Sequence, residues 1–192
     1  MKKAIYLLLV VSLSLTVRTA KATSVIPPTF DELVDQAEVI FEGNVTDVRS
    51  QWVGEGAQRH IVSYVSFKVE EAVKGTPGQS YTIRMLGGTV DGESMVISDA
   101  PRFQVGDKDI IFVQNNGSQF IPLVGIMHGR FHVKRDKNGR DIVTTNAGEP
   151  LRDVAKLGRE EQTQSAREAL TPQAFKAAVA AVQTRQDNRP AQ

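Results

Sequence analysis

The sequence predicts a mainly β fold, in which an antiparallel sheet closes into a small barrel with a short helix before it and a helical tail after it. Three observations predict this fold class. Between Glu38 and Val133, apolar residues recur at every second position in short runs, as in strands with one buried face. Turn dipeptides such as Asp91-Gly92 separate these runs. From Leu151 onward the alternation gives way to residues that favour helices.

The N-terminus has the pattern of a secretory leader. Two lysines precede an apolar run over residues 4–17, and Ala20-Lys21-Ala22 then supplies the small-x-small pattern of a cleavage site. The run is shorter than the roughly 20 residues that cross a bilayer as a helix. We therefore expect residues 1–22 to be a removed signal peptide. The mature protein would begin at Thr23, without a membrane span, in the periplasm or the medium.

Charge and cysteine content narrow the function classes. The whole chain carries 23 Lys and Arg against 22 Asp and Glu, but the leader holds four of the basic residues and no acidic one, so the mature protein is net acidic. This balance argues against a nucleic-acid partner, whose binding depends on clustered basic residues. The chain has no cysteine, so a core without disulfides must hold it together, and thiol chemistry is excluded.

A capping box marks the first helix of the mature chain. Thr29 is placed to cap the helix and Glu32 to reach back to it. Leu33, Val34 and Ala37 then give the short helix an apolar face.

From Glu38 the apolar period changes to two. Strands are expected in the runs 39–45, 61–69, 81–85, 95–97, 110–113, 120–124 and 131–133. Tight turns are expected at Asp91-Gly92, Asn116-Gly117 and Asn138-Gly139. Gly43, Gly125 and Gly129 would mark bulges or bends where the sheet curls. The barrel would span residues 23–150.

The region 151–192 is expected to be a helical extension. Thr171 is an N-cap residue, and Pro172 stands at the first helical position. One face of the helix would carry Phe175, Ala178, Val179 and Val182. We expect this face to dock on the barrel, with residues 183–192 disordered.

No catalytic or cofactor motif stands out. Ser94, Ser98 and Asp99 lie in a hairpin without the pattern of a nucleophile elbow. Gly87-Gly88 fits neither a Walker loop nor a dinucleotide turn. We expect a protein that is not an enzyme and carries no cofactor.

Two histidines offer a metal-binding alternative. His128 and His132 are four residues apart in a β-like segment, which would place them on the same side of one strand. Neighbouring Met127, Arg130 and Phe131 do not resemble ligands. Ordinary polar positions at a barrel rim are the better interpretation.

The mature N-terminus would read Thr23-Ser24-Val25-Ile26-Pro27-Pro28. A free α-amine has a pKa of about 7.7 to 8.0, so it can lose its proton near neutral pH and bind a metal. Pro27 and Pro28 stiffen the segment and remove two backbone donors. On these features alone, an end without function is the simpler interpretation.

This segment resembles the start of the tissue inhibitors of metalloproteinases, which are netrin-like, OB-type barrels. Those inhibitors begin with Cys-x-Cys-Val-Pro-Pro directly after the signal peptide, and the present chain has the same register with Thr23 and Val25 in place of the cysteines. The likeness continues through residues 37–45 and 67–75 and ends near residue 135.

The resemblance implies an inhibitor of a zinc metalloprotease. The α-amine and carbonyl of Thr23 would bind the target's zinc, and Ser24 would enter the pocket beside it. Target contacts would come from Thr23, Ser24, Val25, Ile26, Pro27 and Pro28, together with Gly88, Thr89 and Val90 after the third strand. Without disulfides, the two prolines and the packing of Val25 or Ile26 must hold the segment. The alternative is a non-enzymatic interaction or structural module of the envelope, which uses the barrel face or the C-terminal helix.

Overall fold

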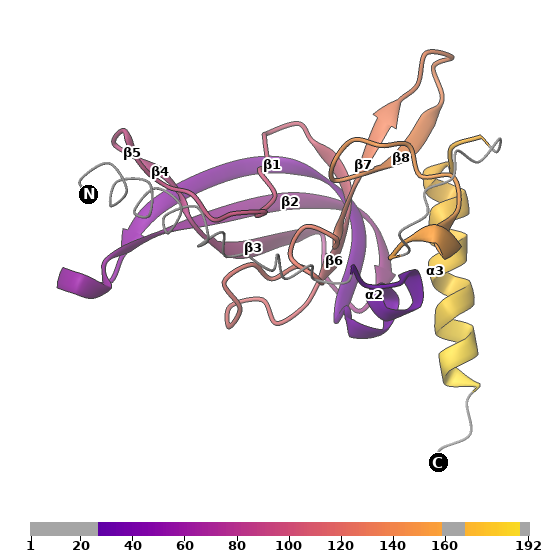
Figure 1. The fold of residues 1–192 in the computed structure, drawn as a ribbon, viewed down its shortest axis with the longest axis horizontal. Helices are drawn as coiled ribbons and strands as arrows, with labels where there is room; N and C mark the ends of the chain where they lie inside the picture. The colour runs from indigo at the N-terminus through magenta and orange to yellow at the C-terminus, as the bar shows by residue number, and fades with distance from the viewer. Residues whose placement is uncertain (1–26, 159–167, 189–192) are drawn as a thin grey trace, which may run out of the picture.

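Residues 27–158 and 168–188 are described by the computed structural model of the chain (Figure 1). The expected leader, the segment Thr23 to Ile26, and residues 189–192 lie outside the described residues. Within the described part, no helix is both long enough and apolar enough to cross a bilayer.

The first described helix is α2, Phe30–Gln36. Its N-terminus is the predicted capping box: the Thr29 N–H donates to Glu32 Oε2 at 2.7 Å, and the Glu32 N–H donates to Thr29 Oγ1 at 3.3 Å. The side chains of Phe30, Leu33 and Val34 are buried against the sheet. The helix therefore fixes the chain immediately after Pro27-Pro28.

An antiparallel six-stranded sheet in the order β3-β2-β1-β6-β7-β8 forms the body of the protein. Its strands are β1 Val39–Val53, β2 His60–Lys74, β3 Ser80–Leu86, β6 Lys108–Val113, β7 Arg130–Arg135 and β8 Asp141–Thr145. A separate two-stranded hairpin consists of β4 Gly88–Val90 and β5 Glu93–Met95. Strands β1 to β3 and β6 to β8 are thus two meanders, which the pairing of β1 with β6 joins into one sheet.

The sheet curls because β1 and β2 are long and irregular. Register shifts interrupt their pairing, one of them between Glu42 and Gly43, so the bulge expected at Gly43 is confirmed. A Cβ atom on Gly43 would lie 2.6 Å from the Lys68 carbonyl oxygen, closer than any side chain tolerates. The two strands arch along the length of the molecule (Figure 1).

The predicted closed barrel is not confirmed, because the outer strands β3 and β8 do not pair with each other. A loop occupies the free edge of β3 instead. The Leu86 N–H donates to the Phe120 carbonyl at 2.7 Å, and the Arg84 N–H donates to Asn116 Oδ1 at 3.1 Å. On the other side of the sheet, β7 pairs with β8. The described structure is therefore an open, curved sheet.

Individual strand predictions fared differently. Runs beginning at residues 39, 61, 81, 110 and 131 are strands, whereas the run 120–124 is a loop with a single bridge between Leu123 and Val113. The strand expected at 95–97 ends at Met95. The hairpin turn at Asp91-Gly92 is confirmed, with positive φ at both residues. Strand β8 was not predicted.

Apolar side chains pack on both faces of the sheet. Ile40 and Phe41, adjacent in β1, belong to different core clusters. The cluster between the sheet and the helices includes Leu33, Ile110, Phe112, Phe131, Val143 and Phe175. The cluster on the concave face includes Val45, Val65, Phe67, Ile83, Phe103 and Leu123.

The C-terminal helix α3, Pro172–Asp187, lies beside α2 and β8 at one end of the molecule (Figure 1). The Thr171 hydroxyl accepts from the Ala174 N–H at 3.2 Å, as its N-cap position predicts. Phe175, Val179 and Val182 are buried in the core that the helix shares with the sheet. The helix continues to Asp187, so the prediction that disorder begins at Gln183 is wrong for residues 183–187.

Candidate functional site

The structure anchors Pro27-Pro28 against two glycines. Gly158 has φ +76°, and a Cβ atom there would lie 2.7 Å from the Pro27 carbonyl oxygen and 2.8 Å from that of Pro28. A Cβ atom on Gly125, φ +59°, would lie 3.0 Å from Pro28 Cγ. Only glycine allows such close approach at positive φ. The chain is therefore held on two sides directly before the capping box.

A hollow of about 220 Å³ lies beside this anchor. Its lining includes Pro27, Pro28, Leu33, Met127, His128 and Leu157. Burial lowers the pKa of His128 below its ordinary value of 6.5, so the imidazole is neutral at pH 7. Arg130, Thr145, Asn146 and Glu149 also line the hollow, so Pro27-Pro28 borders a surface of mixed apolar and polar character.

His128 and His132 do not lie on one strand, so that prediction is wrong. Strand β7 begins at Arg130, which leaves His128 in the preceding loop. His132 lies on the strand, and its Nδ1 is 2.7 Å from Asp109 Oδ1. Among residues 27–158 and 168–188, no three His, Cys, Asp or Glu side chains are grouped to hold a metal.

A buried arginine organises the concave face. Arg130 is 2% exposed, and its guanidinium donates to Asp109 Oδ2 at 3.0 Å, to Asp107 Oδ2 at 2.7 Å and to the Arg102 carbonyl at 2.6 Å. The same guanidinium lies 4.0 Å from the centre of the Phe103 ring. Because two carboxylates, a carbonyl and a ring satisfy it, we assign Arg130 a structural role: it ties the loop after β5 to the sheet.

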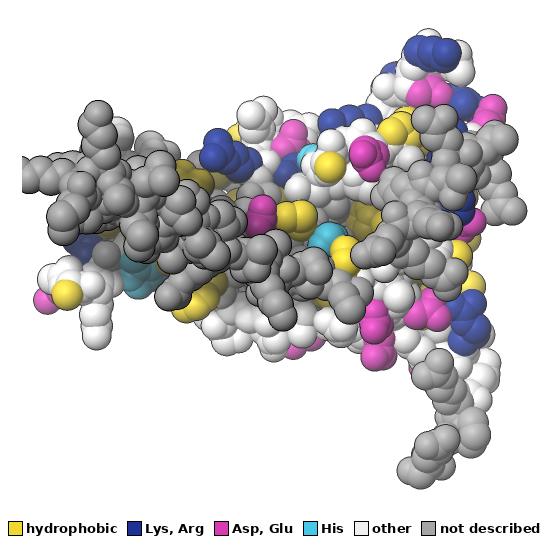
Figure 2. Space-filling model, in the orientation of Figure 1, with side chains coloured by type: hydrophobic (Ala, Val, Ile, Leu, Met, Phe, Trp, Pro, Cys, Tyr) yellow, Lys and Arg dark blue, Asp and Glu magenta, His cyan; other side chains and the backbone are white. Residues whose placement is uncertain are grey.

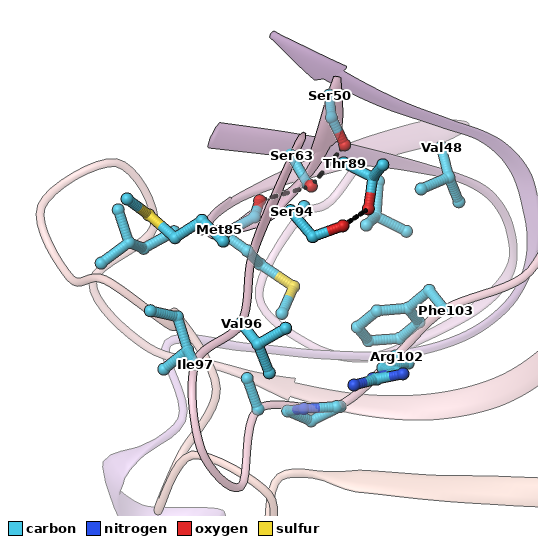
Figure 3. Close-up of a pocket in the computed structure, with 17 residues that line it drawn as sticks. Val48, Ser50, Ser63, Met85, Thr89, Ser94, Val96, Ile97, Arg102 and Phe103 are labelled. Carbon is cyan, nitrogen blue, oxygen red and sulfur yellow. Dashed lines mark hydrogen bonds between the residues drawn. The ribbon is translucent and has the colours of Figure 1, made fainter. Parts of the chain in front are cut away.

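Gly88, Thr89 and Val90 form β4, which roofs a second cavity of about 370 Å³ on the concave face (Figure 3). Gly88 has φ +136°, and a Cβ atom there would lie 2.3 Å from Ser63 Oγ and 2.4 Å from Ser50 Oγ. The Ser63 hydroxyl donates to the Gly87 carbonyl at 2.7 Å. The glycine pair therefore lets the hairpin pass close over the sheet.

The structure does not bring the two predicted parts of the site together. Pro27-Pro28 lies at the α2 end of the molecule, whereas β4 lies at the opposite end (Figure 1), and the two segments line different hollows. Thr23, Ser24, Val25 and Ile26 lie outside the described residues. Four extended residues reach at most roughly 14 Å, which limits how far Thr23 can lie from Pro27.

Sequence reasoning missed the charged cluster and the hydroxyl groups of the second cavity. Arg130 and His132 are two residues apart on β7, and a spacing of two on a strand places side chains on one face. Asp109 lies on the neighbouring strand β6, and Asp107 directly precedes that strand. Charged residues at this spacing beside apolar runs were the sequence signal that could have indicated the buried charged cluster. Ser50 and Ser63 meet only because β1 pairs with β2.

Comparison with models of known protein families and with curated proteins gives no match to this chain. On the parts of the face in Figure 2 where described residues are visible, acidic and basic side chains are interspersed.

Proposed function

We propose that this chain is an exported binding protein that inhibits a zinc metalloprotease through its mature N-terminus. The α-amine and carbonyl oxygen of Thr23 chelate the target's catalytic zinc, and Ser24 enters the adjacent pocket. The observation that carries the proposal is the double anchor of Pro27-Pro28 on Gly125 and Gly158, which lies four residues from the expected first residue.

The anchor takes the place that disulfides hold in the inhibitors which the sequence resembles. Ordering a loose backbone opposes binding by about 1–2 kcal/mol for each residue. Pro27-Pro28 lies close against the two glycines and is followed by the Thr29 capping box, so the backbone from Pro27 onward loses little freedom when the target binds. A base held in this way supports the proposed wedge without cysteine.

The zinc chemistry is straightforward. A catalytic zinc keeps one coordination position for water, and an amine with its own carbonyl displaces that water as a chelate. Only the neutral amine binds, and the α-amine pKa is about 7.7 to 8.0. Inhibition therefore strengthens as pH rises toward about 8 and levels off above it.

We further propose that the sheet is an opened form of a netrin-like, OB-type barrel, in which the outer strands β3 and β8 stay unpaired with each other. The order β3-β2-β1-β6-β7, with a long bent β1 shared by two meanders, supports this relation. A fold does not fix a function, so the inhibitory role depends on the N-terminal anchor and not on the barrel.

The decisive experiment compares three proteins against zinc metalloproteases whose zinc keeps a water ligand. They are the mature chain beginning at Thr23, the same chain with one alanine added before Thr23, and a matched control with one alanine added after Gln192. We expect the mature chain and the control to inhibit equally, and the N-terminal extension to weaken inhibition at least a hundredfold. Equal potency of all three refutes zinc chelation by Thr23.

A second candidate is an interaction module that uses the loops on the open side of the sheet. Phe120 is 72% exposed in the loop that covers the β3 edge, which is unusual for a large apolar side chain. In this case Phe120→Ser abolishes capture of an envelope partner, while deletion of residues 23–26 leaves capture intact. The opposite pattern supports the N-terminal site.

A further inference from the structure

The cavity under β4 has the build of a small-molecule site that is independent of the N-terminus. Its volume of about 370 Å³ falls within the range of ligand pockets, roughly 300–1,000 Å³. The sheet supplies its floor and the β4–β5 hairpin its roof. Both halves are held in place by the close approach of Gly88 to Ser50 and Ser63.

One part of the lining is apolar. Val48 lines the cavity from the sheet and Ile97 from the loop after β5, and both are partly exposed. At the mouth, Val96 is 68% exposed, so an apolar side chain there faces water. This surface would gain from covering by an apolar ligand body.

The polar part is a group of four hydroxyls with spare hydrogen-bonding capacity. Ser63 gives its hydrogen to the Gly87 carbonyl, so Ser50, at 2.8 Å, must donate to Ser63 and keeps its own oxygen free to accept. Thr89 and Ser94 share one hydrogen bond at 2.8 Å, which leaves one hydroxyl hydrogen free to donate. A single ligand hydroxyl can donate to the Ser50 oxygen and accept the free hydrogen of the Thr89–Ser94 pair.

Among the described residues that line the cavity, Arg102 alone carries a charge. Its carbonyl is fixed by Arg130, and its side chain is exposed. No carboxylate of the described residues pairs with its guanidinium. In the view of Figure 3, Arg102 is drawn at the end of the cavity away from Ser50, Ser63 and Thr89.

We infer that this cavity binds a medium-chain carboxylate, with preference for one that carries a hydroxyl at its far end. The carboxylate pairs with Arg102 in a charge-assisted hydrogen bond. Its methylene chain covers the exposed parts of Val48, Val96 and Ile97. A distal hydroxyl reaches the free donor and acceptor of the hydroxyl group formed by Ser50, Ser63, Thr89 and Ser94.

Titration calorimetry on the mature protein tests this with octanoate, decanoate, 10-hydroxydecanoate and decanol. Decanoate should bind about fifteenfold more tightly than octanoate, because each buried methylene contributes roughly a fourfold gain. Decanol should bind at least tenfold more weakly than decanoate, and 10-hydroxydecanoate at least as tightly as decanoate.

Three variants locate the site. Arg102→Gln should weaken decanoate about tenfold and leave decanol unchanged, whereas the matched control Arg135→Gln, on an exposed position of β7, should leave both unchanged. Ser94→Trp should fill the cavity and abolish binding. Its urea unfolding midpoint should match that of the unmodified protein, which verifies that the variant is folded. The proposal is overturned by absence of decanoate binding at millimolar concentration, or by Arg102→Gln and Ser94→Trp variants that bind as the unmodified protein does.

Discussion

Lys176 lies on the buried face of α3 and connects that helix to the sheet. It is 9% exposed, and its ammonium group donates to the carboxylates of Glu42 and Glu71. Glu42 is 5% exposed and also lies 3.0 Å from the Lys108 ammonium. Burial lowers the pKa of Lys176, but its bonds to Glu42 and Glu71 outweigh this effect, so its pKa is raised and it stays charged.

Replacing Lys176 by Met keeps the apolar stem and removes the charge. Removal of one partner from a buried ion pair costs about 3–5 kcal/mol, because the other charge is left buried. Here Lys108 still pairs with Glu42, and the Glu71 side chain is 56% exposed and can return to water. We therefore expect Lys176→Met to reduce the free energy of unfolding by about 2–3 kcal/mol.

Urea unfolding followed by circular dichroism measures this loss as a shift of the midpoint at constant slope. The matched control is Gln173→Met, an exposed position on the same helix, which should change stability by less than about 0.5 kcal/mol. Adding Glu42→Gln to Lys176→Met should recover part of the loss, because the buried side chain at position 42 is then uncharged, while Lys108 keeps its ion pair with Glu70. A Lys176→Met protein as stable as the control refutes the reasoning.

Three further predictions concern pH and backbone strain. Burial lowers the pKa of His128 below 6.5 in the folded protein, so the unfolded chain binds a proton on this imidazole more readily and stability falls as the pH drops below 6.5. His128→Asn should reduce this dependence of the urea midpoint on pH. The hydrogen bond to Lys108 lowers the pKa of Glu70, so the stability that the Glu70 carboxylate contributes is present above pH 4.5 and is lost as the pH falls through the folded-state pKa. The stability difference between Glu70→Gln and the unmodified protein should therefore shrink steadily as the pH is lowered below 4.5. Gly158→Ala should cost about 1–3 kcal/mol more than Gly92→Ala in the same assay, because both positions have positive φ but a Cβ atom on Gly92 meets nothing.

The sequence specified both helices and the long strands because their signals are local. A cap residue, an acidic residue three positions later and a proline at the first helical position need no knowledge of the rest of the chain. The loop 120–124 was misread as a strand because Ile121 and Leu123 are buried like strand residues. Apolar alternation reports burial, and here the buried side chains fill the concave core without a hydrogen-bonded ladder.

Barrel closure and the sites depend on contacts between distant segments. Nothing in the sequence near β3 indicates that Phe120 and Asn116 will occupy its edge. Likewise, the anchor of Pro27-Pro28 depends on glycines about 100 and 130 residues away, whose need for a missing Cβ is visible only in the fold.

Cobalt substitution of the target protease tests the central claim most directly. The visible spectrum of cobalt at a catalytic zinc site reports whether water or an amine occupies its open position. We predict that the mature protein beginning at Thr23 changes this spectrum, and that the same protein with an acetylated N-terminus does not. Inhibition accompanied by an unchanged cobalt spectrum contradicts the account.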